Sequence, residues 1–502
     1  MQWIKAFLVS CALPVILNAD TPPNIILFLV DDMGWQDTSV SFGSTPTSLN
    51  RRYQTPAMQN LAEEGVVFTN AYSASPVCTP SRTAIMTGQC PGRSGISYWI
   101  LHPDRDTSAA HPRLVPPPWN TRGLSKEDST LAKILRQHGY RTIHVGKSHL
   151  GAVGTSGADP TDLGFDINIA GHAAGAPGSY YGIHNFKSQN RKGKSGDSVW
   201  DVPGLEHHHG KDIYLTDALC IEAQRAIKDA KSAEMPFFLQ FAPYAVHTPI
   251  MENPKHIDSY SELDQREAAY ATMVESMDCA LQSIMQSVEE LGILSNTIII
   301  FTSDNGGLSA HGRGGQPHTH NAPLRSGKGS AYEGGIRVPL IISGKTIKRQ
   351  GLRADVPVIS MDIFPTILEL AGIDLATSDH PVIDGVSIAS CVNPDDDYID
   401  NALKDRPLIW HMPHQWGVKG PGIEPFTAVR RGEWKLCLFH DGPRYELYNL
   451  NTDVSESINR AESNPEIVSS LLNELRKWQS ETGARMSRNK STREYVNIPQ
   501  LN

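Results

Sequence analysis

The sequence predicts an α/β protein with a smaller α+β unit at its C-terminal end. Apolar runs of strand length, such as residues 24–30 (NIILFLV) and 297–302 (TIIIFT), show no polar alternation, which is typical of strands buried on both faces of a sheet. These runs alternate with segments of helical length and periodicity, as in α/β sheets. Polar residues suited to chemistry directly follow several of the runs. Because ligands of open α/β sheets bind at the carboxyl ends of the strands, one site is expected there.

The elements of the larger unit follow one another without an internal repeat. In chain order we expect the strand 24–30, the helix 130–138, the strand 141–145, the helix 212–228, the strand 236–242, the helical stretch 261–291, the strand 297–302, the apolar segment 337–342 and the helix 361–370. Two long irregular stretches, at about 93–124 and 151–210, carry aromatic and histidine side chains. We expect them to be ordered loops that shape a substrate site.

The C-terminal part has a different pattern. A change of composition at residues 394–404 (PDDDYIDNALK) predicts a linker between a domain at 20–395 and a subdomain at 405–502. Within the subdomain, residues 407–411, 426–430, 434–439 and 445–448 alternate as short strands. Residues 464–482 follow as a helix, with Asn464 as its cap and Pro465 in the first position. This pattern predicts a small antiparallel sheet and one helix.

The first 19 residues have the composition of a secretory signal. Lys5 precedes the apolar run 6–17, and small residues allow cleavage after Ala19. A lipoprotein signal is the alternative, because residues 8–11 (LVSC) resemble a lipobox around Cys11. Either interpretation predicts export, to the periplasm or the extracellular space. No later segment is long and apolar enough to span a membrane.

Composition excludes several classes of function. The chain has 502 residues, 39% of them hydrophobic and 20% charged, as in ordinary globular proteins. Its formal net charge of −9 gives no reason to expect binding to nucleic acid or to an anionic membrane. Of the seven cysteines, five remain besides Cys11 and Cys78, and they are widely scattered. They predict no disulfide framework and no CxxC zinc site, although one or two bridges stay open.

Residues 78–82, with the sequence Cys-Thr-Pro-Ser-Arg, are the most informative stretch. Thr79 is a good helix cap and Pro80 suits a first helical position, so we expect a short helix that begins just after Cys78 and stops at Gly88. Cys78 would then lie at a helix N-terminus, where free N–H groups favour an anion, with the cation of Arg82 one turn away. The alternative is an ordinary buried cysteine before a helix.

Polar side chains follow four predicted strands at the point where each ends. The pairs and single residues concerned are Asp31 and Asp32, Lys147 and His149, His247, and Asp304 and Asn305. Carboxylate and amide oxygens are hard ligands that suit Ca²⁺ or Mg²⁺ better than a soft transition metal. For either acidic pair alone, a helix cap or a turn would be the simpler explanation. Four strand ends together indicate one charged crevice.

These segments resemble motifs of the type I, formylglycine-dependent sulfatases, a family of the alkaline phosphatase superfamily. The resemblance covers residues 24–35 (NIILFLVDDMGW), the pentapeptide 78–82, residues 146–151 (GKSHLG), 247–249 (HTP), 302–306 (TSDNG), 327–329 (GKG) and 333–339 (EGGIRVP). The C-terminal run 446–450 (ELYNL) is also similar. Four positions depart from the family pattern, Gln36, Ser148, Val454 and Arg460, and none of them removes a catalytic group. The resemblance implies a large mixed sheet flanked by helices, with a smaller C-terminal α+β subdomain.

The resemblance also implies roles for individual residues. Cys78 would be oxidised to formylglycine (3-oxoalanine), whose hydrate attacks the sulfur of a sulfate ester. A calcium ion, with magnesium as the alternative, would be held by Asp31, Asp32, Cys78, Asp304 and Asn305. Arg82 would fix the hydrate, and Lys147 and Lys328 would supply positive charge. His247 is the candidate general acid, shared with Lys328, and His149 would assist the expulsion of sulfate. Asp304 could also take a proton from the attacking hydroxyl.

The resulting prediction is an exported sulfuric ester hydrolase that acts on a sulfated carbohydrate. Residues 97–103 and 116–120 resemble loops of bacterial polysaccharide sulfatases. A formylglycine-generating maturation enzyme is the partner that this chemistry requires. Two alternatives remain, a phosphonate monoester or phosphodiester hydrolase with the same motif, and a non-catalytic glycan-binding relative.

Other histidines and aromatic residues have weaker signals. The run His207, His208 and His209 is typical of a solvated surface, with a structural metal site as the alternative. His318 and His320 lie in a loop that joins two site motifs. The simpler interpretation is a solvated loop, and the alternative is that these histidines contact the substrate. The same pair of interpretations applies to the loop that carries Trp99, His102 and Arg105.

Overall fold

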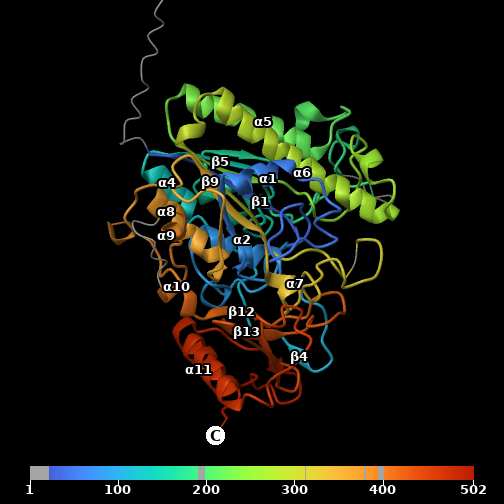
Figure 1. Cartoon of the computed structure of the whole chain (residues 1–502), viewed down its shortest axis with the longest axis vertical. Coiled ribbons are helices and arrows are strands. Elements are labelled where there is room, and N and C mark those ends of the chain that lie inside the picture. Colours follow the sequence, from blue (N-terminus) through green and yellow to red (C-terminus); the bar gives the residue numbers. More distant parts are fainter. Residues whose placement is uncertain (1–21, 190–197, 311, 378–379, 394–400, 502) are drawn as a thin grey trace, which may run out of the picture.

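The computed structural model describes residues 22–189, 198–310, 312–377, 380–393 and 401–501. The predicted signal 1–19 and its Cys11 lie outside these residues. Figure 1 shows helices and a large sheet in the upper part of the molecule, and a second, smaller sheet with one long helix, α11, at the bottom. The predicted α/β core and the smaller C-terminal unit are therefore both present.

The large sheet has eight strands in the order β10-β2-β9-β8-β1-β7-β5-β6. Their bounds are β1 Asn24–Val30, β2 Gly65–Phe68, β5 Arg141–Gly146, β6 Ile167–Ile169, β7 Phe237–Ala242, β8 Thr297–Ser303, β9 Leu340–Gly344 and β10 Leu352–Ala354. Strand β9 runs antiparallel to β2 and β8, and the other neighbouring pairs are parallel. The expected mixed sheet is confirmed.

The central strand β1 shows why the sequence has no polar alternation there. Its side chains alternate between two apolar layers: Ile26, Phe28 and Val30 enter one core, and the side chains between them enter the other. Every residue of β1 is buried. Each fully buried aliphatic or aromatic side chain contributes about 1.5–3 kcal/mol. A strand covered on both faces must therefore be apolar at every position.

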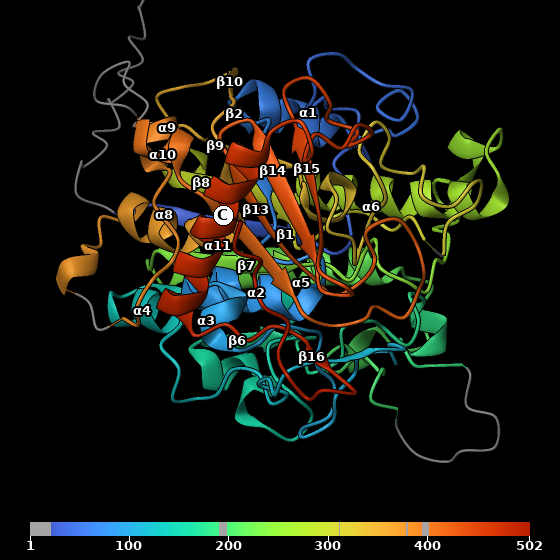
Figure 2. The same cartoon turned by 90° about the horizontal axis from the view of Figure 1, so that it is seen from below.

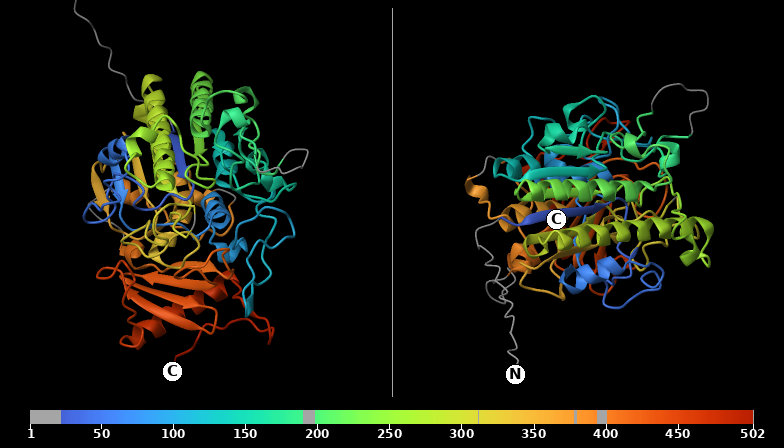
Figure 3. Two further views of the ribbon diagram at one scale, coloured as in Figure 1. Left: turned by 90° about the vertical axis from the view of Figure 1, so that its right-hand side faces the viewer. Right: turned by 90° about the horizontal axis from the view of Figure 1, so that it is seen from above.

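Helices cover both faces of the sheet. One core includes residues of α1 (Pro56–Glu63), α5 (Leu215–Ser232) and α6 (Gln265–Glu290). The other includes residues of α2 (Cys78–Thr87), α4 (Leu131–Gln137) and α8 (Ile363–Leu370). Figure 3 shows α5 and α6 side by side over the sheet. The long helices thus match the predicted helical stretches, although both start later than predicted and α5 ends four residues later, at Ser232.

The predicted bounds also differ near residue 340. We expected an apolar segment at 337–342, but the strand β9 starts at Leu340 because the short helix α7 (Glu333–Ile336) and Pro339 precede it. Proline has no N–H to donate to a sheet. The remaining short elements are β3 Ala71–Tyr72, α3 Pro91–Ser94, β4 Leu114–Val115, β11 Val358–Ile359, α9 Ala389–Val392, α10 Asn401–Asp405 and β16 Arg488–Asn489. Most of the predicted linker, residues 394–400, lies outside the described residues; its last four residues, 401–404, are helical in α10, and Leu403 is buried.

The C-terminal sheet contains the antiparallel strands β12 Leu408–Met412, β13 Phe426–Arg431, β14 Trp434–Phe439 and β15 Arg444–Asn449. Its side chains point alternately to the two faces of the sheet. One face, with Trp410 and Phe439, packs on residues of the large unit such as Tyr72. The other face packs against α11 (Pro465–Thr482), which lies over β13 and β14 in Figure 2. Both faces of this sheet are therefore needed for packing.

Buried polar contacts join the two units. The indole Nε1 of Trp410 donates to the carbonyl of Ser73 at 2.8 Å. The ammonium of Lys435 contacts Glu333 Oε1 at 3.0 Å and Glu456 Oε1 at 2.8 Å, and all three side chains are fully buried. Glu333 begins α7, shortly after Lys328 in the chain. The C-terminal sheet therefore supports a segment that leads directly into the candidate site.

The six cysteines among the described residues are all free thiols. Within the same residues, no helix combines the length and the apolar character needed to cross a membrane.

Candidate active site

The predicted polar residues lie at the carboxyl ends of four adjacent strands, β8, β1, β7 and β5. Parallel registers align these ends: Val30 of β1 pairs with Ser303 of β8, and Gly146 of β5 with Ala242 of β7. Only glycine fits at position 146, because a Cβ there would lie 2.0 Å from the carbonyl oxygen of Ala242. The sheet therefore places side chains that are more than 270 residues apart within hydrogen-bond distance of one another.

Cys78 is the first residue of the buried helix α2, so the helix begins two residues before Pro80, the predicted first position. The predicted cap is wrong by two residues, because Val77 occupies the cap position with no side-chain hydrogen bond. The hydroxyl of Thr79 instead accepts a hydrogen bond from the N–H of Ile100 at 3.2 Å. It thereby fixes the loop after α3. The helix ends at Gly88, which adopts a left-handed conformation.

Three carboxylates and three cations surround the thiol. The Sγ atom of Cys78 lies 3.7 Å from Asp31 Oδ1, 4.0 Å from Asp32 Oδ1 and 3.2 Å from Lys328 Nζ. Lys147 donates to both oxygens of Asp31 at 2.7 Å. Buried charges of this kind persist only when they are paired and hydrogen-bonded.

The second and third ion pairs complete this arrangement. Lys328 Nζ lies 2.6 Å from Asp32 Oδ1. Arg82 donates from Nε to Asp304 Oδ2 at 2.7 Å and from Nη1 to the carbonyl of Lys147 at 2.8 Å. Each cation therefore has its own carboxylate. With the histidines neutral and all three acids ionised, the formal charge of these six side chains is zero.

Several oxygen atoms of the cluster fit a divalent cation. Ligand atoms of Asp31, Asp32, Cys78 and His247 all lie within 4.8 Å of one another. Asp32 Oδ2 and Asn305 Oδ1 are buried and have no hydrogen-bond partner. A buried unpartnered oxygen costs about 1–3 kcal/mol, and a hard cation would remove that cost.

Asp304 is held differently from the other acids. Its Oδ1 accepts from the N–H of Asp32 at 3.1 Å, and its Oδ2 accepts from Arg82. Asp32 and His149 have positive φ angles, of 62° and 56°. Such backbone conformations are uncommon for residues other than glycine, and they cluster at functional sites.

The two predicted histidines have defined tautomers, because each donates to a carbonyl. His247 Nδ1 donates to the carbonyl of Thr248 at 2.7 Å, and its Nε2 lies 3.5 Å from Asp32 Oδ2. His149 Nε2 donates to the carbonyl of Ile100 at 2.7 Å, which leaves its buried Nδ1 without a partner. Burial, followed by the charge of Lys328, lowers the pKa of His247. Burial and the charge of Lys147 lower the pKa of His149.

Electrostatic pairing keeps Asp32 and Lys328 charged, whereas burial outweighs the charge of Lys147 and raises the pKa of Asp31. Burial would raise the pKa of Asp32, but Lys328, His247 and Lys147 outweigh it and lower that pKa below the usual range. Burial would lower the pKa of Lys328, but Asp32 outweighs it and raises that pKa. Lys328 is therefore protonated beside the thiol at neutral pH in the free site.

Sequence reasoning missed two residues, Trp416 at the site and Arg313 next to it. Trp416 comes from the segment between β12 and β13, and its ring centroid lies 5.6 Å from Lys328 Nζ. Arg313 is fully buried and pairs with Asp37 at 3.0 Å and Glu267 at 2.7 Å, so it anchors the loop that follows Asp304 and Asn305. Nothing local in the sequence distinguishes these residues, since the partners are distant in the chain.

The weaker candidates have mixed outcomes. His320 is buried, and its Nε2 donates to the carbonyl of Gly314 at 2.6 Å, so it holds its own loop together. The solvated-surface interpretation of the histidine run is wrong for His208, which is buried, whereas the side chain of His207 is 46% exposed.

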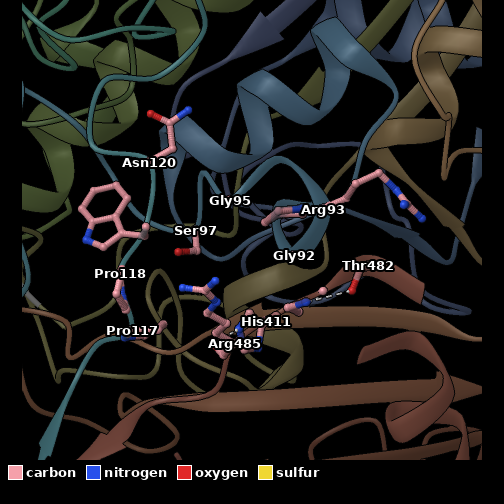
Figure 4. A pocket seen from close by; sticks show the side chains of 14 residues that line it. Gly92, Arg93, Gly95, Ser97, Pro117, Pro118, Asn120, His411, Thr482 and Arg485 are labelled. Atoms are coloured by element: carbon pink, nitrogen blue, oxygen red, sulfur yellow. Dashed lines mark hydrogen bonds between the residues drawn. The ribbon is translucent and has the colours of Figure 1, made fainter. Parts of the chain in front are cut away.

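A separate cavity of about 350 Å³ lies between the large unit and the C-terminal unit. Its lining includes Ser97 and Trp119 from the loop after α3, together with His411 and Arg485 from the C-terminal part. In Figure 4 the side chain of Arg485 extends into the cavity toward Ser97. None of the lining residues belongs to the cluster around Cys78. This cavity is therefore distinct from the charged site.

Comparisons with known proteins agree with the motifs and with the fold. The sequence model of the family described as Sulfatase matches residues 23–373. A sulfatase of Formosa agariphila is 29% identical over 520 residues, which cover 92% of this chain and 89% of that protein. The human N-acetylgalactosamine-6-sulfatase is 30% identical over 403 residues, covering 78% of this chain and 69% of that protein.

A solved structure has the same architecture. The crystal structure of Ps i-CgsB in complex with k-i-k-neocarrahexaose superposes with a TM-score of 0.73 at 27% identity, over 91% of this chain and 93% of that chain. The large mixed sheet, its flanking helices and the small C-terminal sheet are thus those of the alkaline phosphatase-like fold. From these matches and from the site at the strand ends, the chain belongs to the sulfatase family and is a sulfuric ester hydrolase.

Proposed function

We propose that this sulfatase removes sulfate from a sulfated carbohydrate, with Cys78 converted to formylglycine as its nucleophile. The observation that carries the proposal is the position of Cys78, which starts helix α2 and whose Sγ lies 3.2 Å from the ammonium of Lys328. A thiol that only filled space would not need three buried carboxylates and three buried cations around it.

The proposed cofactor is Ca²⁺, with Mg²⁺ as the alternative. Asp31, Asp32, Asp304, Asn305 and the converted side chain of Cys78 would hold it. The unpartnered oxygens of Asp32 and Asn305 support this choice, because carboxylate and amide oxygens suit a hard cation. When bound, such an ion supplies a Lewis acid that polarises a sulfate oxygen.

The charge balance supports an anionic substrate. Three carboxylates, Asp31, Asp32 and Asp304, offset three cations, Arg82, Lys147 and Lys328. A divalent ion would bring the total to about +2, which favours a sulfate ester locally although the whole chain carries −9. The attraction is therefore built into the site and not into the surface as a whole.

Individual side chains have distinct tasks in this proposal. Arg82 orients the nucleophile and holds Asp304, while Lys147 and Lys328 stabilise the charge that develops as the ester bond breaks. Lys328 and His247 share the donation of a proton to the leaving oxygen. His247 is neutral in the free site, and the negative charge of a bound sulfate favours its protonated form. The free Nδ1 of His149 offers a base for the proton of the hydrated nucleophile.

The carbohydrate part of the proposal is supported by the relatives. One solved relative contains a neocarrahexaose, and curated relatives act, by name, on N-acetylgalactosamine 6-sulfate. The two units then correspond to a catalytic domain at 20–395 and a C-terminal subdomain at 405–502. We further propose export through the signal 1–19, and a formylglycine-generating maturation enzyme as the partner.

Two measurements test this function. Peptide mass spectrometry across Cys78 should show the loss of sulfur expected for formylglycine, and an unmodified thiol in the fully active protein would refute the mechanism. Comparison of kcat/KM for an aryl sulfate and an aryl phosphate diester addresses the nearest alternative. A large preference for the phosphorus ester would favour a phosphonate monoester or phosphodiester hydrolase. Inactivity on every sulfate ester despite formylglycine would favour a glycan-binding relative.

A further inference from the structure

A second group of metal-ligating side chains shares no residue with the site around Cys78. His207 and His208 end the short 3₁₀ helix η4 (Glu206–His208), and Glu222 lies two turns into α5. The Nε2 atoms of the two histidines lie 2.7 Å and 2.9 Å from the same carboxylate oxygen, Glu222 Oε1. Their ligand atoms all lie within 4.8 Å of one another.

We propose that His207, His208 and Glu222 bind a divalent transition metal, with Zn²⁺ as the best fit. Zinc bonds to imidazole nitrogen and carboxylate oxygen are about 2.0–2.2 Å long, so tetrahedral ligands lie about 3.3 Å apart. The observed separations of 2.7 Å and 2.9 Å need only a few tenths of an ångström of opening. Two imidazoles with one carboxylate select a transition metal over calcium, which prefers oxygen ligands.

The burial and the charged contacts of these side chains favour a metal site over a solvated surface cluster. The side chains of His208 and Glu222 are 7% and 5% exposed. Arg225 Nη1 lies 3.0 Å from Glu222 Oε2 and turns the other oxygen, Oε1, toward the imidazoles. The side chain of His207 is 46% exposed, so solvent can reach the fourth position of a tetrahedral ion. The histidine run thus supplies two ligands of a preformed set of three, and Glu222 of α5 supplies the third.

The place of the cluster gives the ion a structural task. It ties η4 to α5 and so closes the segment that contains Tyr214. The ring of Tyr214 stacks on that of Tyr180, with centroids 5.4 Å apart. The hydroxyl of Tyr180 donates to the carbonyl of His247 at 2.8 Å. A metal at this position would therefore stiffen the wall that carries His247, without contact with the substrate.

Zinc uptake by the full mature chain tests the proposal. The background is Cys78→Ala with excess Ca²⁺, so that neither the thiol nor the hard-ligand site competes for zinc. Chelator-treated protein is equilibrated with Zn²⁺, and bound metal is counted by elemental mass spectrometry. Co²⁺ absorption spectra report the ligand set independently of activity. His209→Ala is the matched control, because the ring of His209 lies against Phe186 and outside the cluster.

The expected result is one equivalent of zinc in the background protein and in His209→Ala, and none in Glu222→Gln or His208→Ala. Because those two side chains are buried, His207→Ala is the variant that leaves the core intact. It should weaken zinc binding at least about tenfold. Zinc should also raise the Tm of the background protein. Absence of zinc uptake, or equal uptake in Glu222→Gln and His209→Ala, overturns the proposal and identifies a plain hydrogen-bonded cluster.

Discussion

Replacement of Arg82 by lysine tests whether the cation beside Asp304 acts through geometry or through charge alone. Arg82 is fully buried and makes two short hydrogen bonds, one to Asp304 at 2.7 Å and one to the carbonyl of Lys147 at 2.8 Å. A lysine ammonium keeps the charge but cannot reproduce both bonds from one planar group. A lost charge-assisted bond costs about 1.5–3 kcal/mol. At the upper end, this corresponds to about a hundredfold in kcat/KM.

The assay is kcat/KM for an aryl sulfate, normalised to the fraction of formylglycine measured by mass spectrometry in each preparation. That normalisation separates catalysis from maturation. Arg93→Lys is the matched control, because Arg93 also binds a carboxylate, Asp384 at 2.8 Å, but at a partly exposed position outside the cluster. It should change kcat/KM less than about threefold, since exposed ion pairs contribute about 0–1 kcal/mol. Arg82→Lys with kcat/KM within about fivefold of the wild type refutes the geometric role.

Four further predictions follow from contacts described above. Lys147→Met removes both hydrogen bonds that Lys147 donates to the buried carboxylate of Asp31 and leaves it only Arg82 Nη2, 3.7 Å away, so the free energy of unfolding should fall by about 3–5 kcal/mol in urea titrations. Asp31→Asn added to it should restore stability without activity, and no restoration would contradict the pairing. Burial would raise the pKa of Glu267, but Arg313 outweighs it and lowers that pKa to about 2, from 4.5 in the unfolded chain, so Glu267→Gln should cost about 3 kcal/mol at pH 7. This stabilisation is present above pH 4.5 and is lost as pH falls toward 2, so equal deficits at pH 7 and pH 3 would speak against it. Trp410→Ala should cost about 3–5 kcal/mol by differential scanning calorimetry, because the indole is fully buried between the two units, and a cost under about 1 kcal/mol would mean that they pack independently. Removal of the metal by a chelator should abolish sulfate release, and Ca²⁺ should restore it; full activity after verified removal excludes a metal in the reaction.

Sequence reasoning located the strands and the charged residues because both depend on local rules. A strand covered on two faces must be apolar throughout, and β1 and β8 show this directly. The residue that follows such a strand lies at the edge of the sheet, which placed Asp31, Lys147 and Asp304. These arguments need no knowledge of how distant segments meet.

The parts that the sequence did not reveal depend on long-range contacts. Trp416 lies near Lys328 only because the C-terminal sheet packs on the large unit. Arg313 looks like any loop arginine until α6 supplies Glu267. The buried position of His208 likewise depends on Glu222 of α5, fourteen residues further along the chain. Local composition predicts that such residues are exposed to solvent, but contacts with distant segments bury them.

The burial of Cys78 sets an order of events for the life of the protein. Its side chain is 3% exposed, and the groups around it come from segments as far apart as Asp32 and Asn305, which are separated by 273 residues. Once those segments have assembled, a modifying enzyme has no access to the thiol. Under the proposed chemistry, conversion of Cys78 must therefore precede folding. Whether a given molecule becomes active or stays permanently inactive is then determined while its chain is still unfolded.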